Sequence, residues 1–444
     1  MLYARHGVAD IANTHASAQN LTATRTAIAD AFQQAASIRR PTIIFVTGIP
    51  GAGKTLCGLD TAFAGQAAFL TGNPSLVHVL REALARDSDL QLRAARQRME
   101  GVIQALPSFR DHYAKDGIPP ERVVVIDEAQ RCWSKAHAAA KTATSANPLR
   151  DSEPALLLDI MARRDDGPVL LCLIGTGQEI HDGEGGLAEW GIALRTRPAW
   201  YVLAAPSATE APLLRHRLPV LSNAATDPAF HLDVPVRSLR NAAAPAWVDA
   251  VLAGDTEAAR AIARDGIPFS VTRDLATARA RLRRACRGTR RAGLLCSSGA
   301  RRLRAEGLGA TLPHDDPAAV ARWFLDRFPD IRASDALEVA ATEFFAQGLE
   351  LDAAGLCWDG DLVREAANWA CRAFRGTTWT RPRNPDKLAN KLNAYRVLLT
   401  RARYETVIWV PPGDNADPTR DPDTLNDIAG YLLSCGAHRL GSPR

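Results

Sequence analysis

The sequence predicts an α/β protein with two domains, each built on a parallel sheet. Short and almost wholly apolar runs alternate with segments that favour helices, which is typical of parallel strands covered on both faces. The alternation stops at an irregular, proline-containing stretch, residues 205–233, and then starts again. We therefore expect a helical lead-in over residues 1–40, a first domain over residues 41–210 and a second domain over residues 211–444.

Apolar runs mark the expected strands of both domains. In the first domain they are residues 42–47, 67–70, 123–126, 169–174 and 200–203. In the second domain they are residues 269–272, 293–296, 338–341, 355–358 and 407–410. Parallel neighbours need a crossover connection, usually a helix, and helix-forming segments such as residues 75–86 lie between the runs. Each set of runs is therefore expected to form one sheet.

Length and composition are those of a globular protein. The chain has 444 residues, of which 46% are hydrophobic and 23% are charged, and its formal net charge is +5. This mild basic excess permits a polyanionic partner without requiring one. No run approaches the roughly 18 apolar residues of a membrane span, and the opening residues lack an apolar signal core. The eight cysteines form no CxxC pair, so we expect buried thiols in a cytoplasmic protein that does not enter a membrane.

A glycine-rich loop follows the first expected strand and matches the phosphate-loop pattern GxxxxGK[ST]. Small residues let backbone N–H groups wrap phosphates, and the N-terminus of the following helix adds positive potential. Lys54, one of only six lysines, is expected on the outer phosphates, and Thr55 is expected to ligate Mg²⁺. The predicted nucleotide-binding residues of the loop are Gly48, Ile49, Pro50, Gly51, Ala52, Gly53, Lys54 and Thr55.

Two carboxylates end the apolar run at residues 123–126. The carboxyl ends of neighbouring parallel strands meet at one edge of a sheet, so Asp127 can reach the Mg²⁺ shell. Glu128 can then face the water that attacks the γ-phosphate. Gln178 follows the next apolar run and is expected at the same edge. These residues indicate hydrolysis of a nucleoside triphosphate in addition to its binding.

Six segments in order resemble the motifs of superfamily 1 helicases, and they are residues 48–55, 69–84, 123–131, 174–190, 342–352 and 395–403. More narrowly, the chain from about residue 40 to its C-terminus is similar to the bacterial Schlafen group 3-like DNA/RNA helicase domain family. This resemblance implies two tandem RecA-like P-loop NTPase domains with parallel sheets and an ATP cleft between them.

The resemblance also implies further catalytic residues. Gln178 would contact both the γ-phosphate and the attacking water. Arg401 matches the arginine of the last motif, which reaches the γ-phosphate like an arginine finger. Arg237 resembles the other arginine that the second domain contributes. Both guanidinium groups would neutralise charge in the transition state.

Nucleic-acid contacts are implied in the same way. Thr71 and Asn73 stand where superfamily members contact the backbone of a single strand. Gln347, Gly348 and Glu350 resemble the segment that touches the nucleotide ribose and nucleic acid together. The implied cofactors are ATP and Mg²⁺, and the implied partner is single-stranded DNA or RNA.

A separate arginine-rich segment has two interpretations. Residues 273–291 hold eight arginines and one acidic residue. On a helix, Arg279, Arg283 and Arg287 fall in one row, whereas the apolar residues of the segment fall on another face. The cationic row is either a phosphate-binding surface or an ordinary solvated face.

The predicted function is that of an ATP-dependent DNA/RNA helicase or translocase. An alternative is a P-loop ATPase switch, for example a defence or stress component, that controls a protein partner. A small-molecule kinase is disfavoured, because a single-core kinase has no use for Arg401, which lies 401 − 54 = 347 residues after Lys54. ATP turnover measured with and without single-stranded nucleic acid separates the motor from the switch.

Overall fold

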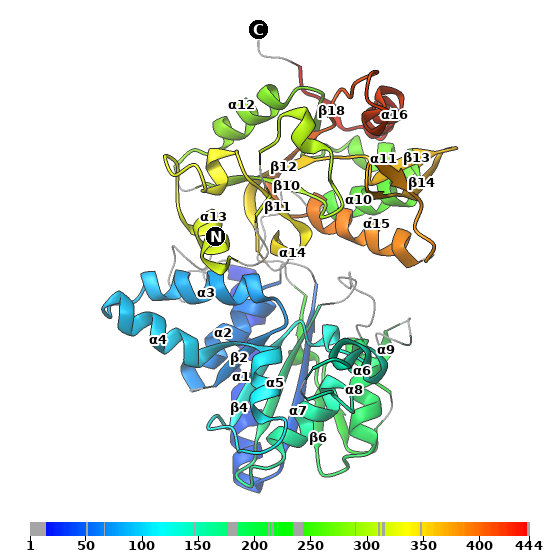
Figure 1. The fold of residues 1–444 in the computed structure, drawn as a ribbon. Coiled ribbons are helices and arrows are strands. Elements are labelled where there is room, and N and C mark those ends of the chain that lie inside the picture. Colours follow the sequence, from blue (N-terminus) through cyan, green and yellow to red (C-terminus); the bar gives the residue numbers. More distant parts are fainter. Residues whose placement is uncertain are drawn as a thin grey trace. The chain divides into compact units, whose positions relative to one another are not determined.

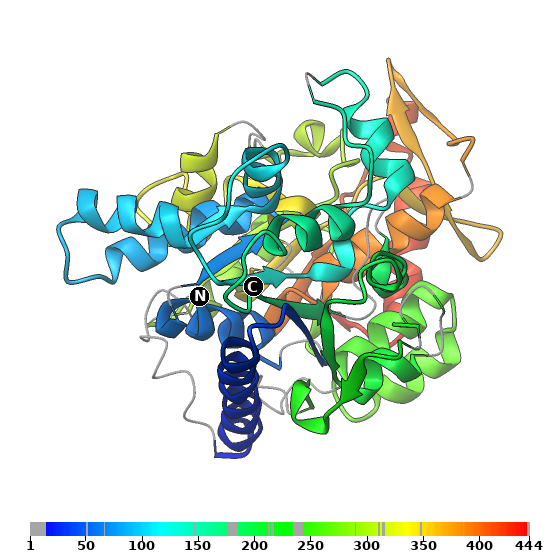
Figure 2. The same cartoon turned by 90° about the horizontal axis from the view of Figure 1, so that it is seen from below.

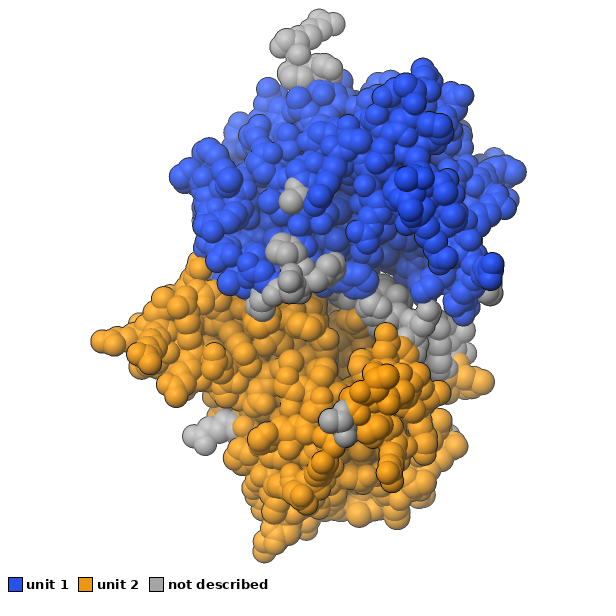
Figure 3. Space-filling model, in the orientation of Figure 1, with its two compact units in different colours: residues 1, 238–444 blue, residues 2–237 orange. Residues whose placement is uncertain are grey.

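The computed structural model describes residues 15–441 except 50–51, 66, 146, 176–184, 212–213, 215–216, 220, 234–242, 289, 310, 313–315, 347–348 and 385. The chain divides into two compact units, Leu2–Arg237 and Ser238–Arg444 (Figure 3). We call them the N-terminal unit and the C-terminal unit. None of the described helices is long and apolar enough to cross a membrane.

The N-terminal unit is an α/β layer structure. Its described strands are β1 (Thr42–Gly48), β2 (Ala68–Thr71), β3 (Ile103–Ala105), β4 (Val123–Asp127), β5 (Val169–Gly175), β6 (Tyr201–Ala204), β7 (Ala224–Thr226) and β8 (His231–Leu232). They form a parallel sheet in the order β3-β2-β4-β5-β1-β6-β7, and β8 pairs with β1. Strands β1 and β5 are buried at every residue, as expected for strands covered on both faces.

Helices cover both faces of this sheet (Figures 1 and 2). The helices of the unit are α1 (His15–Ile38), α2 (Lys54–Gly65), α3 (Pro74–Arg86), α4 (Leu92–Val102), α5 (Leu106–Tyr113), α6 (Lys135–Thr142), α7 (Glu153–Met161), α8 (Gly186–Arg195) and α9 (Pro206–Glu210). Helix α2 packs on one face, where Gly58 lies against Val125 and Leu173. Helices α5, α7 and α8 bury Phe109, Leu157 and Trp190 against the other face.

The C-terminal unit repeats the same kind of layer structure. Its main sheet has the order β11-β10-β12-β17-β9-β18, and all of these strand pairs are parallel. The strands are β9 (Phe269–Thr272), β10 (Ala292–Cys296), β11 (Ala340–Thr342), β12 (Leu351–Cys357), β17 (Ala402–Trp409) and β18 (His438–Arg439). Two antiparallel hairpins follow β12, and they consist of β13 (Leu362–Glu365), β14 (Asn368–Cys371), β15 (Ala373–Arg375) and β16 (Thr378–Thr380).

Helices also pack around this second sheet. They are α10 (Ala244–Ala253), α11 (Thr256–Ala263), α12 (Leu275–Ala285), α13 (Pro317–Leu325), α14 (Glu343–Ala346), α15 (Asp386–Leu399) and α16 (Pro422–Ser434). Helix α12 buries Ala278 and Leu282 in the core of the sheet. The arginine-rich segment thus forms an amphipathic helix from Leu275 to Ala285, whereas Arg287, the last member of the predicted row, lies beyond its end.

The predicted α/β class with two parallel sheets is confirmed, because each expected strand has its counterpart in one of the two sheets. The division between the units lies later than the expected boundary near residue 210. Strands β7 and β8 follow that residue, yet they belong to the sheet of the N-terminal unit. Six of the eight cysteines are buried and none forms a disulfide, while Cys286 and Cys371 are partly exposed.

Candidate nucleotide-binding site

The phosphate loop joins the carboxyl end of β1 to the first turn of α2. Gly48 ends β1, and a β-carbon there would lie 2.8 Å from both the Cβ and the carbonyl oxygen of Leu232 in β8. The backbone N–H of Ile49 donates to the Leu232 carbonyl at 3.1 Å. Gly53 has a φ of 89°, which glycine adopts without strain. The start of the loop therefore requires glycine for close packing, and its end requires glycine for its backbone conformation.

Lys54 opens α2 and folds back over the loop. Its side-chain Nζ donates to the carbonyl oxygens of Gly48 at 2.7 Å and of Ile49 at 3.1 Å. Only 8% of the residue is exposed. A buried ammonium group that bonds the loop's own carbonyls lies where it can exchange those acceptors for phosphate oxygens.

Thr55 and Asp127 meet as the sequence predicts. The Thr55 hydroxyl donates to Asp127 Oδ2 at 3.1 Å and to Oδ1 at 3.3 Å. Asp127 ends β4 and is 3% exposed. Burial, followed by the adjacent charge of Glu128, raises the pKa of Asp127 to about 7. One hydroxyl and one carboxylate fit Mg²⁺, which usually binds one or two protein carboxylates together with substrate phosphates and water.

Within the described residues no cluster of three or more His, Cys, Asp or Glu side chains could hold a metal ion. A Mg²⁺ ion carried by nucleotide phosphates does not need such a cluster. The donor set at Thr55 and Asp127 therefore suits a metal that arrives with the nucleotide.

Glu128 follows Asp127 in an uncommon backbone conformation. Its φ of 54° lies in the left-handed region, which non-glycine residues seldom adopt. Gln130 donates through Nε2 to Glu128 Oε2, and its own Oε1 accepts the backbone N–H of Gly175 at 3.0 Å. A β-carbon at Gly175 would lie 2.7 Å from Glu128 Oε2. The end of β5 and Gln130 together hold the carboxylate in place.

Sequence reasoning missed Gln130 and Gly175. Gln130 is 2% exposed and bridges the ends of β4 and β5. The available signal was a glutamine two residues after Glu128, together with a glycine that follows the next apolar run. Neither residue type indicates this bridge unless the two strands are known to be neighbours.

Thr71 and Asn73 have structural roles beside the same edge. Thr71 pairs in register with Asp127 across β2 and β4. Its hydroxyl accepts the backbone N–H of Asn73 at 3.2 Å, and Asn73 Oδ1 caps α3 by accepting the N–H of Ser75 at 3.0 Å. The two residues are 1% and 8% exposed. Their side chains position the start of α3, and their contact with nucleic acid stays a prediction.

Arg401 and Glu350 lie in the C-terminal unit. Arg401 follows α15 and is 7% exposed. Its guanidinium donates to the carbonyl oxygens of Val397 at 3.1 Å, Ala346 at 3.3 Å and Leu349 at 3.4 Å. Glu350 forms an ion pair of 3.4 Å with Arg403. The structure thus brings the last motif against the segment that ends with Glu350, within one unit.

Some predicted residues lie outside the described part of the chain. They are Pro50 and Gly51 of the phosphate loop, Gln178, Arg237, Gln347 and Gly348. The described residues that the structure brings together are therefore Lys54, Thr55, Asp127 and Glu128, at the carboxyl edge of the N-terminal sheet.

A protein-family model described as Schlafen group 3, DNA/RNA helicase domain, matches residues 41–412. The chain belongs to this family. The matched range of the Schlafen group 3 helicase domain includes the phosphate loop, the acidic end of β4 and Arg401. No curated protein gives a significant match to the chain.

Solved helicase structures also resemble this Schlafen group 3 domain, at low identity. Arterivirus nonstructural protein 10, a helicase in complex with DNA, is 14% identical with a TM-score of 0.27, covering 89% of this chain and 65% of that one. DEAD-box helicase Mss116, bound to ssRNA and UDP-BeF, is 11% identical with a TM-score of 0.37, covering 86% and 68%. The Pyrococcus furiosus Hef helicase domain is 10% identical with a TM-score of 0.30, covering 90% and 96%. The chain thus spans 65% of the length of the arterivirus protein, and the family assignment rests on the family match alone.

Proposed function

We propose that the chain is an ATP-dependent DNA or RNA helicase or translocase, which couples hydrolysis of Mg²⁺-ATP to movement along single-stranded nucleic acid. The observation that carries the proposal is the convergence of Lys54, Thr55, Asp127 and Glu128 at one sheet edge in a chain of the helicase-domain family. A phosphate anchor, a metal-binding pair and a base are the parts that phosphoanhydride hydrolysis requires.

In this proposal the site residues of the N-terminal unit have distinct tasks. Lys54 exchanges the carbonyls of Gly48 and Ile49 for the outer phosphates of ATP. Thr55 and Asp127 would hold Mg²⁺, which supplies charge neutralisation on the phosphates when bound. Glu128 orients the attacking water and accepts its proton, while Gln130 keeps the Glu128 carboxylate in position.

The C-terminal unit would complete the site when ATP is bound. We propose that Arg401 leaves the carbonyls of Ala346 and Leu349 and contacts the γ-phosphate, with Arg237 and Gln178 as further contacts. Alternating closure and opening of the two units, with a strand affinity that differs between the states, would produce stepping. We place this activity in the cytoplasm, on single-stranded DNA or RNA.

The test is ATP turnover with and without single-stranded DNA or RNA. Strong stimulation by a strand is expected for the wild type, and Lys54→Ala should show no turnover under either condition, because the phosphate anchor is lost. Stimulation by a protein partner alone would instead favour an ATPase switch. Wild-type turnover in Lys54→Ala would refute the nucleotide site itself.

A further inference from the structure

The end of helix α12 borders an arginine-lined pocket in the C-terminal unit. We call it the arginine pocket, and its volume is about 370 Å³, within the usual size range of ligand sites. The lining residues that concern its chemistry are Arg281, Arg284, Arg287, Arg290, Tyr404 and Glu405. Helix α12 turns its apolar side, with Leu282, into the core, so that its arginines are left at the surface.

The side chains that line the arginine pocket carry a net positive charge. Its four arginines face two carboxylates, those of Asp352 and Glu405, which leaves 4 − 2 = +2. Glu405 already pairs with Arg281 at 2.6 Å, and Asp352 Oδ2 accepts the backbone N–H of Arg291 at 2.8 Å. Arg284 and Arg287 are exposed and form no ion pair with any other described residue. Unpaired cations at a concave surface attract an anionic ligand.

An aromatic ring stands beside these cations. Tyr404 is 38% exposed, and the guanidinium carbon of Arg290 lies 4.4 Å from the centre of its ring. Between two paired positions β17 has one residue more than β12, since Leu351 pairs with Ala402 but Ala353 pairs with Glu405. Such a bulge redirects side chains, which explains why the consecutive residues Tyr404 and Glu405 both line the pocket.

We propose that the arginine pocket binds a nucleotide unit of single-stranded nucleic acid, with phosphates on Arg284 and Arg287 and a base stacked beside Tyr404. Aromatic rings and arginine planes that accompany a cationic groove are the means by which proteins hold single strands without reading sequence. The pocket lies at the amino ends of β12 and β17, outside the six helicase-like segments except for the end of the segment at residues 342–352. This inference rests on the proposed function for the identity of the polymer, but binding at the pocket needs no ATP.

The first experiment measures strand binding by the full chain without nucleotide. Fluorescence anisotropy of a labelled oligothymidylate or oligouridylate is followed over a range of salt concentrations. For the double variant Arg284→Glu and Arg287→Glu we expect Kd to rise about tenfold or more at low salt. Loss of two phosphate contacts should also lower the slope of log K against log salt by roughly 1.4.

The control is Arg264→Glu, because Arg264 is also exposed, follows the last residue of α11 and has no ion pair with another described residue. It should change Kd by less than about twofold, as expected for an arginine that touches no phosphate. The control changes the net charge by half as much as the double variant, so a control loss of about half the double variant's change in log Kd would mean that only net charge matters. An unchanged slope in the double variant would mean that these arginines bind no phosphate. Either result overturns the proposal.

A second experiment tests the base. Tyr404→Ala should weaken binding of an ordinary oligonucleotide by about tenfold and should leave binding of an abasic strand nearly unchanged, because only bases stack. Tyr404→Phe should restore the affinity, since it keeps the ring. Equal effects of Tyr404→Ala on both strands would remove the base from the proposal.

Two further measurements distinguish strand binding at the arginine pocket from effects on the nucleotide site and from membrane binding. Lys54→Ala should bind the strand normally, and the arginine double variant should keep its ATP turnover in the absence of nucleic acid. The double variant could instead keep both its strand affinity and its strand-stimulated ATP turnover. That result would refute strand binding at the arginine pocket but would not contradict the proposed helicase or translocase function. If the double variant loses binding to phosphatidylserine vesicles and keeps binding to the strand, the pocket is a membrane contact and the proposal is wrong.

Discussion

The carboxylate of Glu128 is held in position by neighbouring residues. Its backbone is left-handed, Gln130 donates to its carboxylate, and the end of β5 at Gly175 lies against the same carboxylate. A strained backbone position of this kind persists only where the surroundings determine it, which is common at functional sites. At this scale the sequence predicts the acid but not the residues that orient it.

Glu128→Gln should retain ATP binding and slow hydrolysis about a hundredfold or more, because an amide cannot accept the proton of the attacking water. Steady-state turnover and the affinity for a fluorescent ATP analogue check the two halves of this prediction. Glu100→Gln, at an exposed position of α4, is the matched control and should behave as the wild type. Near-normal turnover in Glu128→Gln would assign the base to another residue.

Strand β8 shows how a very short element can shape the site. It adds to β1 at the phosphate loop, where Thr47 Oγ1 and His231 Nδ1 lie 2.7 Å apart and Leu232 packs against Gly48. Its two residues gave no periodic signal, because periodicity needs several turns or alternations. The tertiary pairing with β1, far away in the sequence, is what makes β8 a strand.

Gly48→Ala should therefore displace β8 from the phosphate loop. The added β-carbon would lie 2.8 Å from two atoms of Leu232, and such overpacking destabilises a protein by about 1–3 kcal/mol. We expect a lower urea midpoint and weaker ATP binding. Gly72→Ala is the matched control, because a β-carbon there meets nothing within 4 Å. Equal behaviour of the two variants would show that the loop tolerates the contact.

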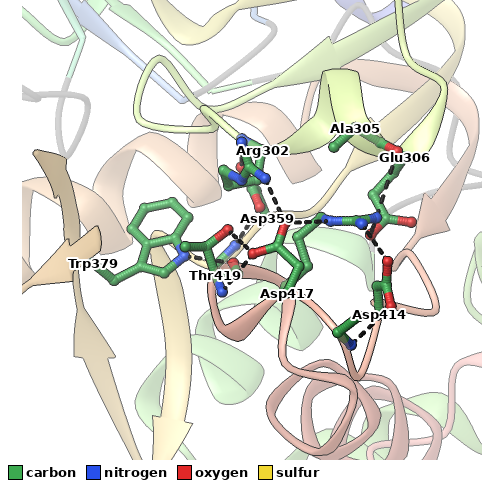
Figure 4. A network of polar contacts seen from close by, with 11 residues as sticks. Arg302, Ala305, Glu306, Asp359, Trp379, Asp414, Asp417 and Thr419 are labelled. Atoms are coloured by element: carbon green, nitrogen blue, oxygen red, sulfur yellow. Dashed lines mark hydrogen bonds and ion pairs between the residues drawn. The ribbon is translucent and has the colours of Figure 1, made fainter. Parts of the chain in front are cut away.

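The carboxyl edge of the C-terminal sheet carries a network of polar groups around the buried Asp359 (Figure 4). Asp359 Oδ2 accepts the backbone N–H of Arg302 at 2.8 Å, and the Arg302 side chain reaches Asp417 at 2.5 Å. Asp361, fully buried nearby, is held by Lys391 at 2.7 Å and by Tyr395 at 2.7 Å. Burial and the charge of Asp361 raise the pKa of Asp359 to about 6.

This shift makes stability depend on pH. The pKa of the Asp359 carboxyl is raised from 3.8 to about 6, so the folded state binds this proton more tightly than the unfolded state does. The free energy of unfolding therefore falls as pH rises from about 4 to about 6, by at most about 3 kcal/mol. Asp359→Asn removes the titration. In urea unfolding, its stability relative to wild type should improve between about pH 4 and about pH 7. A difference that is constant with pH would contradict the prediction, since a lost hydrogen bond alone gives a constant offset.

At the scale of the whole molecule, the proposal divides the reaction between two units. The phosphate loop and the acidic strand end belong to the N-terminal unit, and Arg401 belongs to the C-terminal unit. Each unit has its own parallel sheet and its own core. A motor needs such a division, because ATP can couple to movement only if its binding and release change the relation of two bodies.

Arg401→Ala should lower kcat by about a thousandfold while the affinity for ATP changes little, because an arginine finger acts mainly in the transition state. Single-turnover hydrolysis and ATP titration measure the two quantities. Arg401 also bonds three backbone carbonyls, so thermal unfolding of the variant is measured in parallel. Lost stability with normal kcat would make Arg401 a structural residue, and equal losses in kcat and affinity would indicate simple binding.

The sequence by itself determined the α/β class, the phosphate loop and the acidic end of β4, because each depends on a pattern of consecutive residues that is typical of a strand, a turn or a helix. Only the tertiary structure decided that Gln130 links Glu128 to the end of β5, that β8 closes on Gly48 and that Tyr404 lies beside Arg290 at the arginine pocket. These arrangements depend on which strands are neighbours and in which register they pair. Strand pairing is a long-range property that local residue patterns do not specify.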